Sequence, residues 1–378
     1  MKKLGLYIHI PFCQRKCNYC DFLSAPATKQ VQNAYMETLQ KEIREKATEY
    51  REWSVDTVFI GGGTPTSVSY EMLVEMVETV KTEFCLDNGC EITMECNPGT
   101  VTLEALEAYR SAGINRLSIG LQSTEDELLK KLGRIHTYEQ FLETYRWARE
   151  AGFDNINVDI MSALPEQSLK QYEDTLEKIA MLGVEHISAY SLIVEEGTPF
   201  YEWYEKDMLL LPDEEEERQM YYKTKEVLAK VGYTRYEISN YAKEGYECRH
   251  NIRYWVRKPY LGLGLGASSF VSKERYKNVS VLEAYMSDDG YMKKEEAEKL
   301  SEREEMEEFM FLGLRLTKGV KKFKFEKEFG RSIEEVYGAV IDRLKGERLI
   351  EEDEESIWLT EYGVDVSNVV LLEFLLDN

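Results

Sequence analysis

The chain alternates six times between a short β-rich run and an amphipathic helical stretch, and this alternation is the strongest constraint on its fold. Strands separated by helices predict a parallel sheet with helices packed on it, either as an open sheet or as a barrel. In both arrangements ligands bind at the carboxyl ends of the strands. The predicted strands are LGLYIHI (4–10), DTVFIGG (56–62), EITMECN (91–97), NRLSIGL (115–121), DNINVDIM (154–161) and HISAYSLI (186–193).

The pattern changes after about residue 200. We predict a helix that begins after Pro212 and a strand at 233–238. The aromatic and glycine-rich segment 240–270 lacks strand or helix periodicity. We therefore expect it to connect and cover the barrel rather than to form another β/α unit.

In the last part of the chain, three predicted helices and a strand pair replace the alternation of strands and helices. A capping box, Ser301-x-x-Glu304, opens the first of three predicted helices, and a strand pair follows near 348–359. Three helices and a hairpin are typical of a winged-helix-like α+β domain. We expect three parts: a barrel core at 1–200, a barrel extension and connector at 201–295, and a C-terminal domain at 296–378.

Charge and composition limit the partners of this 378-residue chain. A net charge of −23 repels phosphate backbones, so we expect no nucleic-acid partner. The apolar runs are shorter than a membrane span and the N-terminus lacks a signal-peptide cleavage site, which favours a cytoplasmic protein without a transmembrane segment. In a reducing compartment, clustered cysteines indicate metal binding or catalysis rather than disulfides.

Three of the seven cysteines form such a cluster directly after the first predicted strand, as Cys13-x3-Cys17-x2-Cys20. Three thiolates can hold three irons of a [4Fe–4S] cubane and leave the fourth iron open to a non-protein ligand. Zinc is the alternative, but it needs a fourth ligand, and neither His9 nor Asp21 has a suitable spacing. The sequence favours a cluster and leaves a zinc-binding interaction protein as an alternative.

Polar and glycine residues end the other predicted strands. Gly62, Gly63 and Thr64 follow the second strand, where backbone without Cβ atoms can approach a ligand closely. Three successive strands end with polar side chains, and Arg134 is available for a charge-assisted pair with a carboxylate. Together they predict a ligand site at this edge of the sheet. The strand-end side chains are Glu95, Gln122 and Asp159.

The cysteine spacing after the first strand resembles the signature of the radical S-adenosylmethionine (SAM) superfamily. The resemblance implies a partial six-stranded (β/α)6 barrel of TIM-like type. It also implies that the amino and carboxylate groups of SAM bind the open iron, and that an electron from the cluster cleaves the sulfonium to give methionine and a 5'-deoxyadenosyl radical. Tyr19, between the last two cysteines, is also typical of this superfamily.

Motifs along nearly the whole chain resemble the coproporphyrinogen dehydrogenase-like branch of that superfamily. Anaerobic coproporphyrinogen dehydrogenases carry a further cysteine two residues after the third, where this chain has Phe22, and an N-terminal extension before the first strand. The motifs are YIHIPFC, KCNYCDF, GGGTPT, ECNPG, NRLSIGLQS, LGRIHT, DIMSALPEQ, ISAYSLIVEEGTPF, YEISNYA and HNIRYW.

The segment HNIRYW resembles the H-N-x-x-Y-W motif of the HemW-type haem chaperones. That resemblance implies that His250, Asn251, Tyr254 and Trp255 bind haem. Neutral imidazole is a good ligand of haem iron, although a histidine among aromatic residues is more often structural. By the same resemblance the SAM site is lined by Tyr7, Tyr19, Gly62, Gly63, Thr64, Glu95, Gln122, Arg134, Asp159 and Ile193.

The leading hypothesis is therefore an iron-sulfur and SAM-binding haem chaperone that delivers haem to respiratory haem proteins. In this hypothesis the cluster and SAM gate haem transfer or dimerisation, so the expected partners are haem, a membrane-associated haem acceptor and a second copy of the chain. The alternatives are an enzyme that decarboxylates coproporphyrinogen III oxidatively or opens haem by radical chemistry. The sequence assigns no role to Cys248.

Overall fold

The computed structural model describes residues 1–376 and has an α/β fold with six parallel strands in chain order. Their positions agree with the six predicted strands, and the sheet stays open, so the prediction of a partial (β/α)6 barrel is confirmed. The strands are β1 (Lys2–Ile10), β2 (Trp53–Gly62), β3 (Leu86–Cys96), β4 (Arg116–Gln122), β5 (Ile156–Ser162) and β6 (His186–Ser191).

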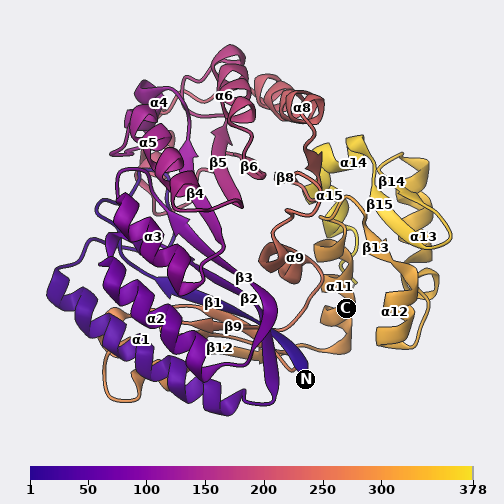
Figure 1. Cartoon of the computed structure of the whole chain (residues 1–378). Helices are drawn as coiled ribbons and strands as arrows, with labels where there is room; N and C mark the ends of the chain where they lie inside the picture. The colour runs from indigo at the N-terminus through magenta and orange to yellow at the C-terminus, as the bar shows by residue number, and fades with distance from the viewer. Residues whose placement is uncertain (377–378) are drawn as a thin grey trace.

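Helices that connect these strands pack on the outer face of the curved sheet (Figure 1). The capping box Thr137-x-x-Gln140 opens α5, and Gly113 ends α3 in the left-handed conformation that glycine adopts without strain. The helices are α1 (Lys29–Glu49), α2 (Tyr70–Glu83), α3 (Leu103–Ala112), α4 (Asp126–Lys131), α5 (Tyr138–Glu150) and α6 (Leu169–Leu182), with a 3-10 turn, η1 (Pro65–Ser67).

The sheet has twelve strands, because the segment after β6 adds a strand group to each edge. The segment 240–270, predicted to connect and cover the barrel, also contributes strands to both edges. Next to β6 lie β8 (Asn240–Ala242) and β7 (Thr234–Arg235). Next to β1 lie β9 (Tyr260–Leu263), β10 (Ser268–Val271), β11 (Glu274–Asn278) and β12 (Lys294–Lys299). The accompanying helices are α7 (Pro199–Tyr204), α8 (Glu214–Lys230), α9 (Arg249–Trp255), α10 (Leu282–Tyr285) and η2 (Gly290–Met292).

Two glycines explain how β9 reaches the sheet without a recognisable strand pattern. A Cβ on Gly262 would lie 2.3 Å from Ser268 O, and one on Gly264 would lie 2.6 Å from His9 O. Only glycine allows β10 to approach β9 this closely, and the residue after β9 to approach β1. The pairing is thus set by tertiary contacts rather than by local alternation.

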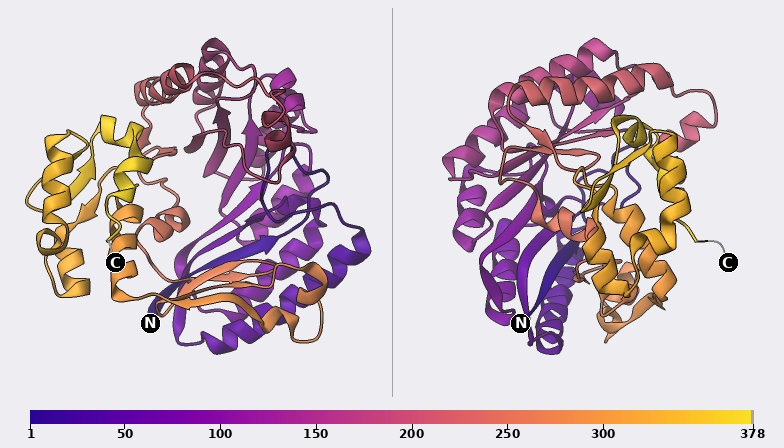
Figure 2. Two further views of the ribbon diagram at one scale, coloured as in Figure 1. Left: turned by 180° about the vertical axis from the view of Figure 1, so that it is seen from behind. Right: turned by 90° about the vertical axis from the view of Figure 1, so that its right-hand side faces the viewer.

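The C-terminal elements form a second hydrophobic core beside α8 and α9 (Figures 1 and 2). This core centres on an aromatic group in which Phe325 contacts Phe309, Phe329 and Tyr337 edge-on or tilted. Three helices precede the hairpin, as predicted, and β13 adds a third strand to it. The elements are α11 (Glu302–Gly313), β13 (Val320–Lys321), α12 (Lys322–Phe329), α13 (Ile333–Gly346), β14 (Ile350–Glu352), β15 (Ser356–Leu359), α14 (Glu361–Asp365) and α15 (Ser367–Leu372).

Within residues 1–376, we find no helix with the length and apolar character needed to cross a bilayer.

A buried carboxylate on α1 ties the added strands to the barrel. Glu42 accepts hydrogen bonds from Gly264 N (2.8 Å), Asn278 Nδ2 (2.6 Å) and Tyr285 hydroxyl (2.7 Å). Tyr35 hydroxyl donates to His9 O (2.6 Å) in the same region. Removing the Glu42 carboxylate would leave three buried donors without this acceptor, which is costly.

We predict that Glu42→Ala lowers the free energy of unfolding by about 3 kcal/mol, because each unsatisfied buried donor costs at least about 1 kcal/mol. Urea denaturation of the purified protein measures this change. Glu37→Ala, an exposed position on the same helix, is the matched control and should stay within about 0.5 kcal/mol of wild type. Equal effects of the two substitutions would contradict the structural role given to Glu42.

The same carboxylate predicts a pH dependence of stability. Burial raises the pKa of Glu42 from its usual 4.5 to about 7. Between these values the folded chain holds a proton that the unfolded chain has lost, so the free energy of unfolding should fall as pH rises from 4.5 to 7. Glu42→Gln should lose this component of the pH dependence. Parallel pH profiles of the two proteins would contradict it.

Candidate functional site

The cysteine loop follows β1, and its three thiols border one cavity of ≈ 500 Å³. Cys13, Cys17 and Cys20 are each half-buried and none of the three is in a disulfide. Asn18 N donates to Leu132 O at 2.9 Å, which fixes the loop against the segment that follows β4. The loop is thereby held across the carboxyl ends of the parallel strands, where the strand pattern predicts the site.

Two side chains donate to these sulfurs. Thr64 Oγ1 lies 3.5 Å from Cys13 Sγ, and Arg134 Nη1 lies 3.7 Å from Cys17 Sγ. Burial raises the pKa of the Cys20 thiol to about 11, so this thiol needs a cation to ionise. Metal coordination deprotonates a thiol outright. In the part of the chain that the structure describes, no group of three His, Cys, Asp or Glu side chains is arranged so that it could hold one metal ion.

The glycine loop after β2 packs directly on the cysteine loop. Gly62 has a φ of 110°, and a Cβ there would lie 2.4 Å from the imidazole of His9. A Cβ on Gly63 would lie 2.6 Å from Phe12 O, and Thr64 N donates to that same oxygen at 2.7 Å. The glycines are therefore required to bring Thr64 against the cysteine loop, in addition to any approach to a ligand.

Two carboxylates face the cavity from β3 and β5. Glu95 accepts from Gly62 N (3.1 Å), and Asp159 accepts from Asn157 Nδ2 (2.7 Å) and Ser118 Oγ (3.3 Å). Burial, and then the charge of Asp159, raises the pKa of Glu95 to about 8, and burial also raises the pKa of Asp159. A cationic ligand between two such groups would relieve their repulsion and favour ionisation. The pair fits the sulfonium or ammonium group of SAM.

Arg134 and Gln122 are fixed by neighbours at the ends of β3, β4 and β6. Arg134 Nη2 donates to Asn97 Oδ1 (2.8 Å) and to Gly120 O, while its buried Nε has no partner among the described residues. Gln122 has a φ of 75° and accepts from the Tyr190 hydroxyl at 3.0 Å. The unsatisfied Nε leaves Arg134 able to donate to a further acceptor, such as a carboxylate.

The structure brings together nearly all the residues predicted for the cluster and SAM. Tyr7 is the exception: it borders a second cavity, which shares Gly62 and Glu95 with the first. Ile193 is 67% exposed and contributes at the rim. Those that line the first cavity are Cys13, Cys17, Tyr19, Cys20, Gly62, Gly63, Thr64, Glu95, Gln122, Arg134, Asp159 and Ile193.

Sequence reasoning missed several residues that line the same cavity: Asn97, Ser118, Ser188, Tyr190 and Asn240. The period of two along a strand was the available signal for some of them. Ser118 is two residues before Gly120, and Ser188 precedes Tyr190 by the same interval, so each pair faces one side of the sheet. Asn240 gave no such signal, because it lies in a three-residue strand.

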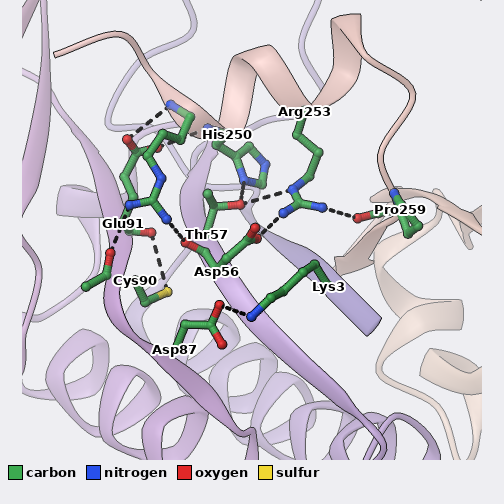
Figure 3. Close-up of polar contacts among 11 residues, drawn as sticks. Lys3, Asp56, Thr57, Asp87, Cys90, Glu91, His250, Arg253 and Pro259 are labelled. Carbon is green, nitrogen blue, oxygen red and sulfur yellow. Dashed lines mark hydrogen bonds and ion pairs between the residues drawn. The ribbon is translucent and has the colours of Figure 1, made fainter. Parts of the chain in front are cut away.

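The H-N-x-x-Y-W motif forms α9, which lies inside the curved sheet near the amino-terminal parts of β2 and β3 (Figures 1 and 3). His250 is 1% exposed. Its Nδ1 is 2.9 Å from Thr57 Oγ1, its Nε2 is 2.9 Å from the Tyr254 hydroxyl, and its backbone N donates to Glu91 Oε1 at 3.0 Å. Both imidazole nitrogens are therefore occupied in this conformation.

The four motif residues have different surroundings. Asn251 borders the first cavity and Tyr254 borders the second. Trp255 borders neither cavity. The guanidinium carbon of Arg315 lies over the Trp255 ring, 4.5 Å from the ring centre. Burial, with smaller contributions from Arg253 and Arg116, lowers the pKa of His250 to about 3. The imidazole is thus neutral at physiological pH, the form that ligates metals.

Cys248, directly before α9, is fully buried. Its Sγ lies 3.8 Å from Glu91 Oε1, and burial raises the pKa of the thiol to about 12. A protonated, enclosed thiol is unreactive. In this structure Cys248 acts as a packing residue before the helix.

A fourth cysteine, Cys96, lies at the wall of the first cavity but outside the cysteine loop. It is 2% exposed, and its thiol donates to Asn97 O at 3.7 Å. Burial raises the pKa of this thiol to about 12. Cys96 is therefore a protonated wall residue, whereas the three loop thiols are partly accessible.

The donor set at the first cavity fits the two groups that the sequence predicts. Three accessible thiols from one loop suit a cubane with one open iron. Cys13, Cys17 and Cys20 would hold the cluster, while Glu95 and Asp159 would face the cationic part of SAM. When bound, the cluster would supply one electron, and SAM would supply the sulfonium that this electron can reduce.

Comparisons with known proteins agree with this geometry. Residues 7–179 match the family model of the radical SAM superfamily, and residues 300–366 match that of the HemN C-terminal domain. The solved structure of coproporphyrinogen III oxidase (HemN) from Escherichia coli has a TM-score of 0.86 and 22% identity, and the match covers 99% of this chain and 90% of that one. This likeness shows a shared fold.

Curated relatives resemble the chain over almost its whole length. A protein named heme chaperone HemW from Lactococcus lactis is 37% identical over 377 residues, which cover 100% of this chain and 98% of that protein. The protein of the same name from Bacillus subtilis is 38% identical, and the match covers 98% of both chains. The chain therefore belongs to the radical SAM superfamily and, within it, to the HemW family.

Proposed function

We propose that this chain is a haem chaperone, which binds haem and delivers it to respiratory haem proteins. The observation that carries the proposal is the similarity to proteins named heme chaperone HemW along 98–100% of this chain, including the C-terminal part. A protein that shared only the radical SAM core with these relatives would not need to resemble them in its C-terminal part. The haem is cargo in this proposal, and the cluster and SAM are resident groups.

The chain's own residues have distinct roles in the proposal. The three loop cysteines anchor the cluster, and Thr64 and Arg134 stabilise thiolate charge by donating to two of the sulfurs. Glu95 and Asp159, which line the same cavity, select a cationic ligand. The arrangement favours SAM binding next to the cysteine loop and leaves the second cavity for another ligand.

Phe22 favours a chaperone over a coproporphyrinogen dehydrogenase. It occupies the position at which those enzymes, by the resemblance given above, have a further cysteine. Phe22 is 59% exposed and borders both cavities. The fold shared with HemN carries no substrate assignment at 22% identity, so oxidative decarboxylation stays the rival activity.

Further parts of the proposal concern location, assembly and organisation. We place the protein in the cytoplasm, with a membrane-associated haem acceptor and a homodimer as its expected partners. We also propose the division at 1–200, 201–295 and 296–378, which agrees with the separate hydrophobic core of the last part.

We predict that the anaerobically reconstituted wild type holds about four irons and four sulfides per chain, the content of one cubane. Cys17→Ala should lose most of the iron and the brown absorbance, because a thiolate ligand is missing. Cys85→Ala is the matched control, since Cys85 is exposed and outside the cavity. Iron retained by Cys17→Ala, or a single zinc in wild type, would contradict the cluster assignment.

We predict stoichiometric haem binding by the reconstituted protein and transfer of that haem to a haem-free respiratory protein. Absorbance titration measures the first and recovery of acceptor activity the second. The same preparation should not decarboxylate coproporphyrinogen III in the presence of reductant and SAM. Substrate-dependent formation of deoxyadenosine together with porphyrin turnover would support the enzyme and contradict the chaperone.

A further inference from the structure

A third cavity, of ≈ 560 Å³, lies where the C-terminal elements pack beside α8, β7 and β8 (Figures 1 and 2). Its lining residues differ from those that border the first and the second cavity. The volume falls in the range of about 300–1,000 Å³ that is usual for small-molecule sites, and such sites often lie between separately packed parts of a protein. The cavity is therefore a candidate site apart from that of the cluster and SAM.

Two kinds of contact join the walls of the third cavity. Thr317 N, after α11, donates to Tyr236 O, between β7 and β8, at 3.0 Å. Lys225 of α8 forms an ion pair with Glu361 of α14. Thr317, Lys225 and Glu361 themselves line the cavity. A ligand bound there would thus contact both the barrel and the C-terminal elements.

The side chains around the third cavity separate into a buried apolar group and an exposed charged group. Trp358 and Val364 are half-buried and add to the apolar surface. This division suits a ligand with an apolar body and a charged end. The buried apolar residues are Tyr233, Tyr241, Leu314 and Leu359, and the exposed charged residues are Lys225, Glu351 and Glu361.

Arg315 lines the third cavity and has unused hydrogen-bonding capacity. Within residues 1–376, its guanidinium has no carboxylate in ion-pair contact, and its buried Nε has no hydrogen-bond partner. Its guanidinium carbon lies 4.5 Å from the ring centre of Trp255, a cation–π contact that positions the group. Burial raises the pKa of Glu237, and the charge of Arg315 offsets this in part from a greater distance. An anion in the cavity would supply the acceptor that the guanidinium lacks.

The charges that line the third cavity favour a monoanion. They comprise three cationic side chains, Lys225, Arg235 and Arg315, and two acidic ones, Glu351 and Glu361. Glu361 pairs with both Lys225 and Arg235, which leaves Arg315 as the available cation. A phosphate monoester carries close to two negative charges at neutral pH, whereas a carboxylate carries one, which a single guanidinium can bind with two parallel hydrogen bonds.

We propose that the third cavity binds an amphiphilic monocarboxylate, with its carboxylate on Arg315 and its apolar body against Tyr241 and Trp358. The site is independent of the proposed function, since it uses neither the cluster nor the first two cavities. Because its walls come from the barrel and from the C-terminal elements, the ligand would stabilise the packing of one on the other. Trp255 acts as the positioning residue for the guanidinium.

The test is calorimetric titration of the reconstituted full chain with octanoate and, separately, with 1-octanol. The two probes have the same chain length and differ in the charge of the head group. We expect saturable binding of octanoate to about one site per chain, and at least about tenfold weaker binding of 1-octanol, which corresponds to roughly 1.4 kcal/mol. Octanoate should also raise the thermal unfolding temperature.

Two variants locate the site. Arg315→Gln should bind octanoate at least about tenfold more weakly and 1-octanol as wild type does, because only the charged contact is lost. Arg331→Gln is the matched control, since Arg331 is exposed in the C-terminal part and outside the cavity. Ala229→Trp starts from an exposed residue of α8 at the cavity wall, and its larger side chain should exclude octanoate.

Circular dichroism and iron content identify any variant that fails to fold, and the comparison of the two probes on wild type does not depend on the variants. The inference is overturned if wild type shows no saturable octanoate binding or binds 1-octanol equally well. Arg315→Gln behaving as Arg331→Gln does, or unchanged binding by Ala229→Trp, would also overturn it. None of these results bears on haem binding, so the chaperone proposal is tested separately.

Discussion

The contact between the cysteine loop and the glycine loop is the constraint on which the rest of the site depends. Gly63 N donates to Ile10 O at 2.9 Å and Thr64 N to Phe12 O at 2.7 Å, so the chain after β2 is hydrogen-bonded to the chain that enters the cysteine loop. A side chain at Gly62 or Gly63 would collide with His9 or with this loop. The contact places the Thr64 hydroxyl 3.5 Å from Cys13 Sγ, and Gly62 N in the same loop donates to Glu95 of β3 at 3.1 Å.

The concave face of the sheet carries polar side chains at two levels, because residues two apart in a strand share a face. Near the carboxyl ends, Glu95 and Asp159 face the first cavity. Earlier in the same strands, Asn157 and Glu91 face the buried region around α9, where His186 Nδ1 lies 2.5 Å from Asn157 Oδ1. The residues near the carboxyl ends therefore suit ligands, whereas Glu91, earlier in β3, fixes the start of the helix that carries the H-N-x-x-Y-W motif.

Much of the fold and of the first cavity could be predicted from local sequence. Strand periodicity indicates the six parallel strands, and the rule that ligands bind at their carboxyl ends correctly groups Glu95, Gln122 and Asp159 around one cavity. The pairing of β9 with β10 and with β1 could not be predicted, since it depends on the close approach of Gly262 to Ser268 O and of Gly264 to His9 O. The enclosure of His250 likewise depends on Thr57 and Glu91, which are more than 150 residues away in the sequence.

The central claim is that three thiolates leave one iron open to SAM. Electron paramagnetic resonance of the reduced, reconstituted protein, recorded with and without SAM, tests it most directly. The account predicts a cubane signal whose g values change when SAM is added, because SAM becomes a ligand of the open iron. A cubane signal that is identical with and without SAM would contradict it.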